Sequence, residues 1–238
     1  MSRIHRSAIS ATPVLLFLLL CGATLQAQRS SETAADVTFA FERAGQQVPR
    51  FILTVDQSGR GTYKGDQTEP VVRGVLAQPA TVAFEQRYEL SSQTTRRIFA
   101  LADELDHFNI ACASKAKNVA DTGTKTLTYI APGTMLSCTY NYSENKGVNA
   151  LSDLFMAIAE TMDEGRALDH LHRYDRLGLD AAMSFLSKEV SDGHALELGT
   201  IATTLRSIAD DAEVIERVRM RARALLMLAP AQTRQPTQ

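Results

Sequence analysis

The segment FILTVDQSGRGTY (residues 51–63) has the pattern of two strands joined by a tight turn. Phe51, Leu53 and Val55 recur at every second position, which is the period of a strand with one buried face. Ser58-Gly59 and Gly61 supply turn residues, and Tyr63 resumes the apolar pattern on the returning strand. This segment predicts an antiparallel β-hairpin.

The same period of two extends to both sides of this hairpin, from Val37 to Tyr142, and one helix interrupts it. Ser91 or Ser92 can cap that helix, which we expect over residues 92–106. The segments KTLTYI and MLSCTYNY, separated by Ala131-Pro132-Gly133, predict a last hairpin. The pattern predicts an α+β fold, in which helices cover an antiparallel sheet of about five to six strands.

From Val148 onward the apolar residues instead repeat every 3.6 positions, which predicts a C-terminal all-α segment. Four apolar stripes are separated by expected breaks at Gly165, Gly178, Gly193 and Asp210-Asp211. We expect the first of these helices to pack on the sheet. The last three form either a small helical subdomain or an extension that grips the edge of the sheet domain. The predicted domains are a sheet domain (28–164), a helical subdomain (165–229) and a flexible tail (230–238).

Residues 1–27 have the features of a secretory signal peptide. A basic start with Arg3 and Arg6 precedes the apolar run PVLLFLLL, and we expect cleavage after Ala27. The alternative is a lipoprotein signal at LLLCG, in which Cys21 would be acylated. The protein is therefore expected to be exported by a bacterium and to be periplasmic or extracellular, or else anchored to the membrane at Cys21.

Export also affects the cysteines, because an oxidising compartment favours disulfides. Once Cys21 leaves with the signal, Cys112 and Cys138 remain. Each cysteine stands at one of the apolar positions of an alternating segment, which are expected to face the core. Both sulfurs can therefore point into the same core. We predict a disulfide between them, and the alternative is two buried free thiols.

The charge of the chain argues against a nucleic-acid partner. Without Arg3 and Arg6 there are 23 basic and 27 acidic residues, for a net charge of −4. Binding to phosphates needs a concentrated basic surface, which this balance does not provide. No phosphate loop, nucleophile elbow or zinc-protease motif occurs in the sequence, so it predicts no cofactor. The oligomeric state stays open.

Asp121-Thr122-Gly123-Thr124 is the tetrapeptide that surrounds each catalytic carboxylate of aspartic proteases. Such a site needs two carboxylates that share a proton, and the sequence holds no second copy. The preceding SKAKN is polar, whereas a catalytic loop should follow an apolar strand. We therefore expect Asp121 to accept backbone N–H bonds in a turn before a strand.

The segment DHLHRYDR (residues 169–176) contains residue types that bind zinc. His170 and His172 are two apart and would point in different directions on a helix, whereas Asp169 and His172 are a feasible pair. A pair does not make a metal site, and the alternative is a solvated helix end with ion pairs. His194, beside small and acidic residues, is expected to be a surface histidine.

Residues 36–163 resemble a family of secreted bacterial α+β domains with no assigned function. The resemblance rests on the order of FILTVDQSGRGTYKGD, a strand ending in YELSS, the helix TTRRIFALADELDHF, the segment VADTGTKTLTY and a closing helix. It implies export and an α+β fold, and it implies no catalytic or binding residues.

We expect a noncatalytic protein that binds or scaffolds an unidentified protein or peptide of the cell envelope. The helix expected from Asp211 to Leu228 is the candidate interaction element, because its segment ERVRMRARALLML combines an apolar stripe with an arginine-rich side. The alternative for this segment is an ordinary packed terminal helix. The alternative function is a secreted hydrolase whose site is built from carboxylates scattered along the chain.

Overall fold

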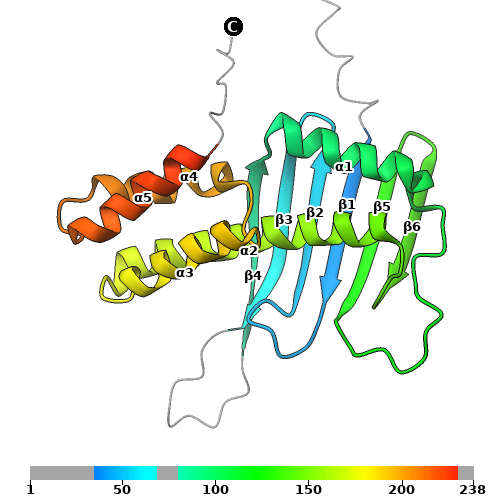
Figure 1. Cartoon of the computed structure of the whole chain (residues 1–238), viewed down its shortest axis with the longest axis horizontal. Helices are drawn as coiled ribbons and strands as arrows, with labels where there is room; N and C mark the ends of the chain where they lie inside the picture. Colours follow the sequence, from blue (N-terminus) through cyan, green and yellow to red (C-terminus); the bar gives the residue numbers. More distant parts are fainter. Residues whose placement is uncertain (1–34, 69–79, 230–238) are drawn as a thin grey trace, which may run out of the picture. The chain divides into compact units, whose positions relative to one another are not determined.

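A computed structural model describes residues 35–68 and 80–229 of the chain. The expected signal peptide (1–27), Cys21 and the expected tail (230–238) lie outside the described residues. The described part has an α+β fold, as the sequence predicted, with an antiparallel sheet followed mainly by helices (Figure 1). Among the described helices, none combines the length and the apolar character needed to cross a bilayer.

Within the described residues, the sheet has six antiparallel strands in the order β4-β3-β2-β1-β5-β6. Their bounds are β1 (Asp36–Glu42), β2 (Arg50–Asp56), β3 (Arg60–Thr68), β4 (Thr81–Glu89), β5 (Thr124–Ala131) and β6 (Thr134–Tyr140). The predicted hairpin of residues 51–63 is the β2–β3 pair, in which Leu53 lies opposite Tyr63. The final hairpin is β5–β6, in which Leu127 lies opposite Cys138.

The β2–β3 turn is held by Asp56, whose carboxylate accepts the backbone N–H groups of Ser58 at 2.8 Å and Arg60 at 3.1 Å. Gly59 in this turn has φ +87°, a conformation that glycine adopts without steric cost. Gly61 is needed for space, because a Cβ there would collide with the Thr54 carbonyl oxygen and the Tyr88 ring. The two glycines thus serve two different purposes in one hairpin.

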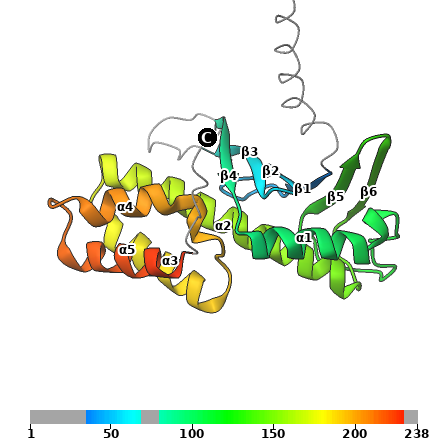
Figure 2. The same cartoon turned by 90° about the horizontal axis from the view of Figure 1, so that it is seen from above.

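Helices α1 (Ser92–Glu104) and α2 (Lys146–Tyr174) cover the same face of the sheet (Figures 1 and 2). Ser91 caps α1, as expected, and its Oγ accepts the N–H of Thr94 at 3.3 Å. In the core beneath them the rings of Phe39 and Phe155 stack with centroids 5.3 Å apart. The apolar face of the sheet is therefore buried by two helices that come from different parts of the chain.

The predicted disulfide between Cys112 and Cys138 is present, with Cα atoms 5.8 Å apart. Both cysteines are buried in the sheet core. Cys112 follows the short 3-10 helix η1 (Asp106–Phe108), whereas Cys138 lies on β6. The bond therefore ties the irregular segment between α1 and β5 to the last strand.

The expected helix break at Gly165 is wrong, because α2 continues through it to Tyr174. Gly165 instead allows a close approach, since a Cβ on it would collide with the side chain of Ile201. Tertiary packing here compensates for the low helix propensity of glycine. The other helices are α3 (Leu179–Asp192), η2 (Leu198–Ile201), α4 (Ala202–Asp210) and α5 (Glu216–Leu228).

α2 contributes to two separate cores. Its first part, up to Met162, packs in the sheet core, whereas Leu168 belongs to a second core formed with α3, η2, α4 and α5. Between these two positions lies a polar stretch with Asp163, Glu164 and Arg166. The long helix thus carries acidic residues at the place where the two cores meet.

Candidate cation-binding site

Asp121 lies in a turn that leads into β5. Its Oδ1 accepts the N–H of Gly123 at 2.9 Å, and Gly123 has φ +93°. Thr122 is bound to Asn141, whose side-chain oxygen accepts the Thr122 N–H at 2.7 Å. These contacts are those of the turn that the sequence predicted as the alternative to a protease loop.

Asp169 and His172 each pair with a different residue. Asp169 pairs with Arg173 at 2.8 Å, while His172 Nε2 lies 2.8 Å from a carboxylate oxygen of Asp211. Arg176 also contacts Asp211, at 3.2 Å. The two candidates therefore take part in separate ion pairs near the end of α2.

The arginine-rich helix α5 packs against its neighbours. Its apolar stripe of Val218, Ala222 and Leu225 is buried in the second core. Arg217 and Arg221 both pair with Asp180 of α3, at 2.8 Å and 2.5 Å. This geometry favours the packed terminal helix over the interaction element.

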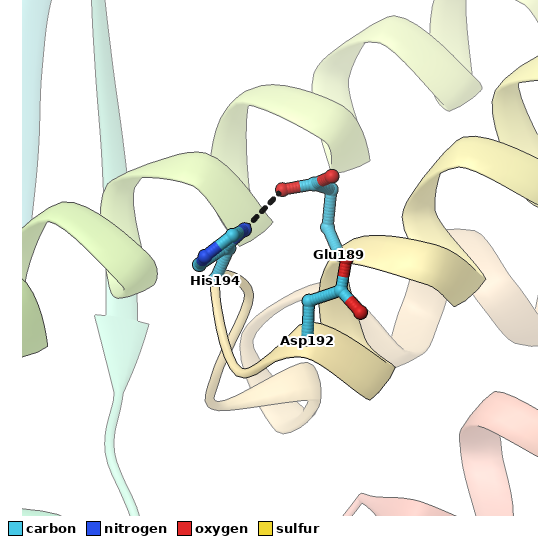
Figure 3. A group of neighbouring side chains, drawn as sticks. All are labelled: Glu189, Asp192 and His194. Atoms are coloured by element: carbon cyan, nitrogen blue, oxygen red, sulfur yellow. Dashed lines mark hydrogen bonds and ion pairs between the residues drawn. The ribbon is translucent and has the colours of Figure 1, made fainter.

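Glu189, Asp192 and His194 form a compact group at the C-terminal end of α3. One oxygen or nitrogen atom from each lies within 4.8 Å of the corresponding atoms of the other two. Figure 3 shows the His194 ring turned toward Glu189, with Nδ1 3.1 Å from a Glu189 carboxylate oxygen. Of these side chains, Glu189 is largely enclosed, whereas His194 is exposed.

The way in which α3 ends creates this group. Glu189 and Asp192 are three positions apart and so lie on one face of the helix. Gly193 follows in the left-handed conformation, with φ +79°, and reverses the chain. Because the N–H of His194 then binds the carbonyl of Glu189 at 2.8 Å, the imidazole returns to the side of that glutamate.

The loop after His194 is bound at three points, which limits how far it can move. Leu196 donates its N–H to the Ala157 carbonyl of α2 at 3.2 Å, and its own carbonyl accepts the Thr161 hydroxyl at 2.6 Å. Glu197 then accepts hydrogen bonds from Ser91 at the start of α1. His194 is therefore carried on a fixed segment.

A hollow of about 590 Å³ adjoins this group, between α2 and the end of α3. α2 contributes Asp153, Met156, Ala157 and Glu160, and the other wall is formed by Glu189, Gly193 and His194. The four positions on α2 follow the helical repeat and so form one face. The hollow thus has three carboxylates and one imidazole on its walls.

Carboxylates near this hollow have raised pKa values. Burial raises the pKa of Glu164 to about 7, and the neighbouring charges of Glu160, Asp163 and Glu189 add to the shift. The pKa of Glu160 is also raised, mainly by burial and then by Asp163 and Glu189, whereas His194 acts in the opposite direction. Negative charge is therefore crowded here, and a bound cation would relieve that repulsion.

Two basic groups partly compensate this charge. Arg166 pairs with Asp163 at 2.9 Å and lies over the Phe84 ring, 3.7 Å from its centroid. Lys188 lies 2.5 Å from Asp192 and 3.9 Å from Glu189, on a side chain that is 68% exposed. The Lys188 ammonium is thus a cationic group that already interacts with Glu189 and Asp192.

Sequence reasoning missed Asp153, Glu160, Glu189 and Asp192, and it treated His194 as an isolated surface residue. The pattern KEVSDGH (residues 188–194) held a local signal, because two acids one helical turn apart precede a glycine and a histidine. The contribution of α2 had no such signal, because Asp153 and Glu160 reach the hollow only through the packing of α2 against the end of α3.

Comparison of the chain with known protein families found no matching family, and no curated protein matched it either.

Proposed function

We propose that this chain is an exported, noncatalytic binding protein of the bacterial envelope that captures a basic segment of another protein or peptide in the acidic hollow. The observation that carries the proposal is the hollow itself, with Asp153, Glu160 and Glu189 on opposite walls. Its volume of about 590 Å³ is within the usual range of ligand pockets.

The charge of the walls supports a cationic ligand. Glu160 on the wall, and Glu164 one helical turn further along α2, have pKa values above the usual range because they are partly buried among other carboxylates. A lysine or arginine side chain in the hollow would favour their ionised forms and gain charge-assisted hydrogen bonds. An anionic or apolar ligand would gain neither.

The hollow is also built from well-fixed elements. One wall is the middle of α2, whose opposite face is buried in the sheet core, and the other is the end of α3 with its anchored loop. Such a site loses little conformational entropy when a ligand binds. This favours recognition of a short segment by a preformed surface.

The test uses fluorescent tetralysine and tetraglutamate peptides, with fluorescence anisotropy as the readout. We expect the protein to bind tetralysine with an affinity that falls as salt is added, and not to bind tetraglutamate. The double variant Asp153→Asn/Glu160→Gln should weaken tetralysine binding by about tenfold or more. Glu85→Gln, an exposed glutamate of β4 that pairs with Lys64, serves as the control and should bind as the wild type does.

Two results would count against the proposal. Equal binding of both peptides would show that charge does not direct recognition, and equal binding by both variants would place the basic peptide elsewhere on the surface. A cross-linked capture from envelope extract then identifies the natural partner, which the wild type should retain and the Asp153→Asn/Glu160→Gln variant should lose.

A carboxylate-based hydrolase is the second candidate, and Glu164 is the observation that favours it. A carboxyl group with a pKa of about 7 is suited to general acid or base catalysis near neutral pH. Turnover of peptide or glycan substrates by the wild type, lost in Glu164→Gln, would support the hydrolase. No turnover by either protein, together with tetralysine binding, would favour the binding protein.

A further inference from the structure

We propose that Glu189, Asp192 and His194 bind a divalent cation of the first transition series. The three side chains offer two carboxylate oxygens and one imidazole nitrogen, all within 4.8 Å of one another. This inference goes beyond the binding of a basic segment. It shares Glu189 and His194 with the acidic hollow but does not require that a peptide binds there.

The mixture of donor atoms indicates the class of ion. Magnesium and calcium prefer sites made only of oxygen, whereas imidazole together with carboxylates suits zinc, manganese, cobalt and nickel. Three protein donors leave further coordination positions for water or for a ligand atom. The site is therefore expected to bind Zn²⁺ and Co²⁺ in preference to Ca²⁺ and Mg²⁺.

The local backbone supports a cation at this place. Glu189 and Asp192 lie in the last turn of α3, where the ends of the peptide dipoles already carry negative partial charge. Carboxylates are unfavourable in that position; the last turn contains no basic residue, and Lys188, immediately before it, supplies a compensating charge. Helix C-terminal ends ordinarily favour basic residues, and this group places two carboxylates there instead. A bound cation would offset the resulting repulsion.

The geometry of His194 fits the role of a ligand. The chain reverses at Gly193, and the His194 N–H donates to the Glu189 carbonyl, which brings the imidazole back toward Glu189. The following loop is anchored to α2 and α1. The imidazole is 66% exposed, so an ion can reach it from solvent. The three donor atoms, all within 4.8 Å of one another, are close to the spacing that a shared ion requires.

Lys188 is the competitor for this position. Its ammonium lies 2.5 Å from Asp192 and 3.9 Å from Glu189, and its exposed stem can turn into solvent. A divalent ion that binds two carboxylates must displace this ammonium. Lys188→Ala should therefore strengthen metal binding several-fold, whereas Lys64→Ala, a lysine paired with Glu85 on the sheet, should not change it.

The experiment measures Zn²⁺ binding to the full chain by calorimetry and Co²⁺ binding by visible absorption. His194→Gln and Asp192→Asn should each weaken binding by about tenfold or more. His170→Gln is the matched control, because His170 is an exposed histidine of α2 whose ring contacts that of Tyr174 at a tilt of 48°. Thermal unfolding of each metal-free variant shows whether it is folded.

The inference is overturned if neither Zn²⁺ nor Co²⁺ binds the wild type, or if His170→Gln weakens binding as much as His194→Gln does. Ca²⁺ binding that is unaffected by His194→Gln would also overturn it, because it would show an acidic surface without a defined site. Tetralysine binding without Zn²⁺ binding would leave the proposed function standing alone. Zn²⁺ binding without tetralysine binding would support the metal site and count against the proposed function.

Discussion

The carboxylate of Glu197 accepts hydrogen bonds from the backbone N–H and the hydroxyl of Ser91, at 2.8 Å and 2.7 Å, although the two residues are 106 positions apart. Ser91 is the N-cap of α1, so the carboxylate also lies where the helix dipole favours negative charge. Glu197 precedes η2, and this contact therefore connects the helical region to the first helix on the sheet.

Glu197→Gln should lower the free energy of unfolding by about 1–2 kcal/mol, because it replaces charge-assisted hydrogen bonds with weaker ones and removes a favourable charge from the helix start. Urea unfolding followed by circular dichroism measures the change. Glu213→Gln is the control, since Glu213 is 78% exposed and pairs only with Arg176 among the described residues. Equal stability of the Glu197→Gln protein and the wild type would show that this contact does not hold the two regions together.

Removal of the disulfide should destabilise the protein by about 3–4 kcal/mol on the chain-entropy estimate, because the bond closes a loop between positions 26 apart. Cys112→Ala/Cys138→Ala should therefore unfold at lower temperature than the oxidised wild type. Mass spectrometry of the purified full chain gives a direct check, since reduction should add the mass of two hydrogen atoms. An unchanged mass would show that the cysteines are free.

At the turn before β5, the two residues of the protease-like tetrapeptide should respond differently to substitution. Asp121→Asn should change stability by less than about 0.5 kcal/mol, because an asparagine side chain can also accept the Gly123 N–H. Gly123→Ala should cost about 2–3 kcal/mol, because φ is +93° and the new Cβ would come within 2.6 Å of the Phe41 ring. Thermal unfolding compares the two, and a loss of proteolytic activity in Asp121→Asn would contradict the turn assignment.

Glu164 should make stability fall as pH rises. Its pKa is raised from 4.5 to about 7 in the folded protein, so the folded state binds more protons than the unfolded state between these values. The stabilisation by the protonated form is complete below pH 4.5 and is lost as pH approaches 7. Because the side chain is partly exposed, we expect about 1 kcal/mol from this group after allowance for solvent screening.

Glu164→Gln keeps the shape of the side chain and cannot ionise. The variant should therefore be more stable than the wild type at pH 8, by about 1 kcal/mol, and nearly equal to it at pH 4. Urea unfolding at a series of pH values gives the difference between the two proteins. A difference that does not depend on pH would mean that the carboxyl does not titrate in the predicted range.

Gly165→Ala should destabilise the protein even though alanine is the better helix former. A Cβ at this position collides with Ile201, whose side chain packs against α2. We expect a loss of about 1–3 kcal/mol from overpacking. Gly165→Ala should cost less stability in the Ile201→Ala background than in the wild type, because the smaller side chain leaves room for the new Cβ. Equal costs in the two backgrounds of this double-mutant cycle would contradict a direct contact between the two residues.

Much of the fold could be predicted from local patterns. The alternation of Phe51, Leu53 and Val55 indicated β2, and Ser91 was a predicted cap that the structure confirms. The cysteine pair was predicted in the same way, because Cys112 and Cys138 each shared a buried face in their own segments. The break at Gly165 was wrong because glycine lowers helix propensity by only about 1 kcal/mol, and contact with Ile201 outweighs this.

The candidate site was beyond such reasoning. Asp153 and Glu160 of α2 share a hollow with Glu189 and His194 because α2 packs against the end of α3, and sequence periodicity does not specify which helices meet. The spacing of apolar residues along a segment indicates which of its faces is buried, because side chains on one face recur with the repeat of the local backbone. The meeting of distant polar side chains, and the pKa shifts that follow from their crowding, depends on long-range packing, which only the tertiary structure decides.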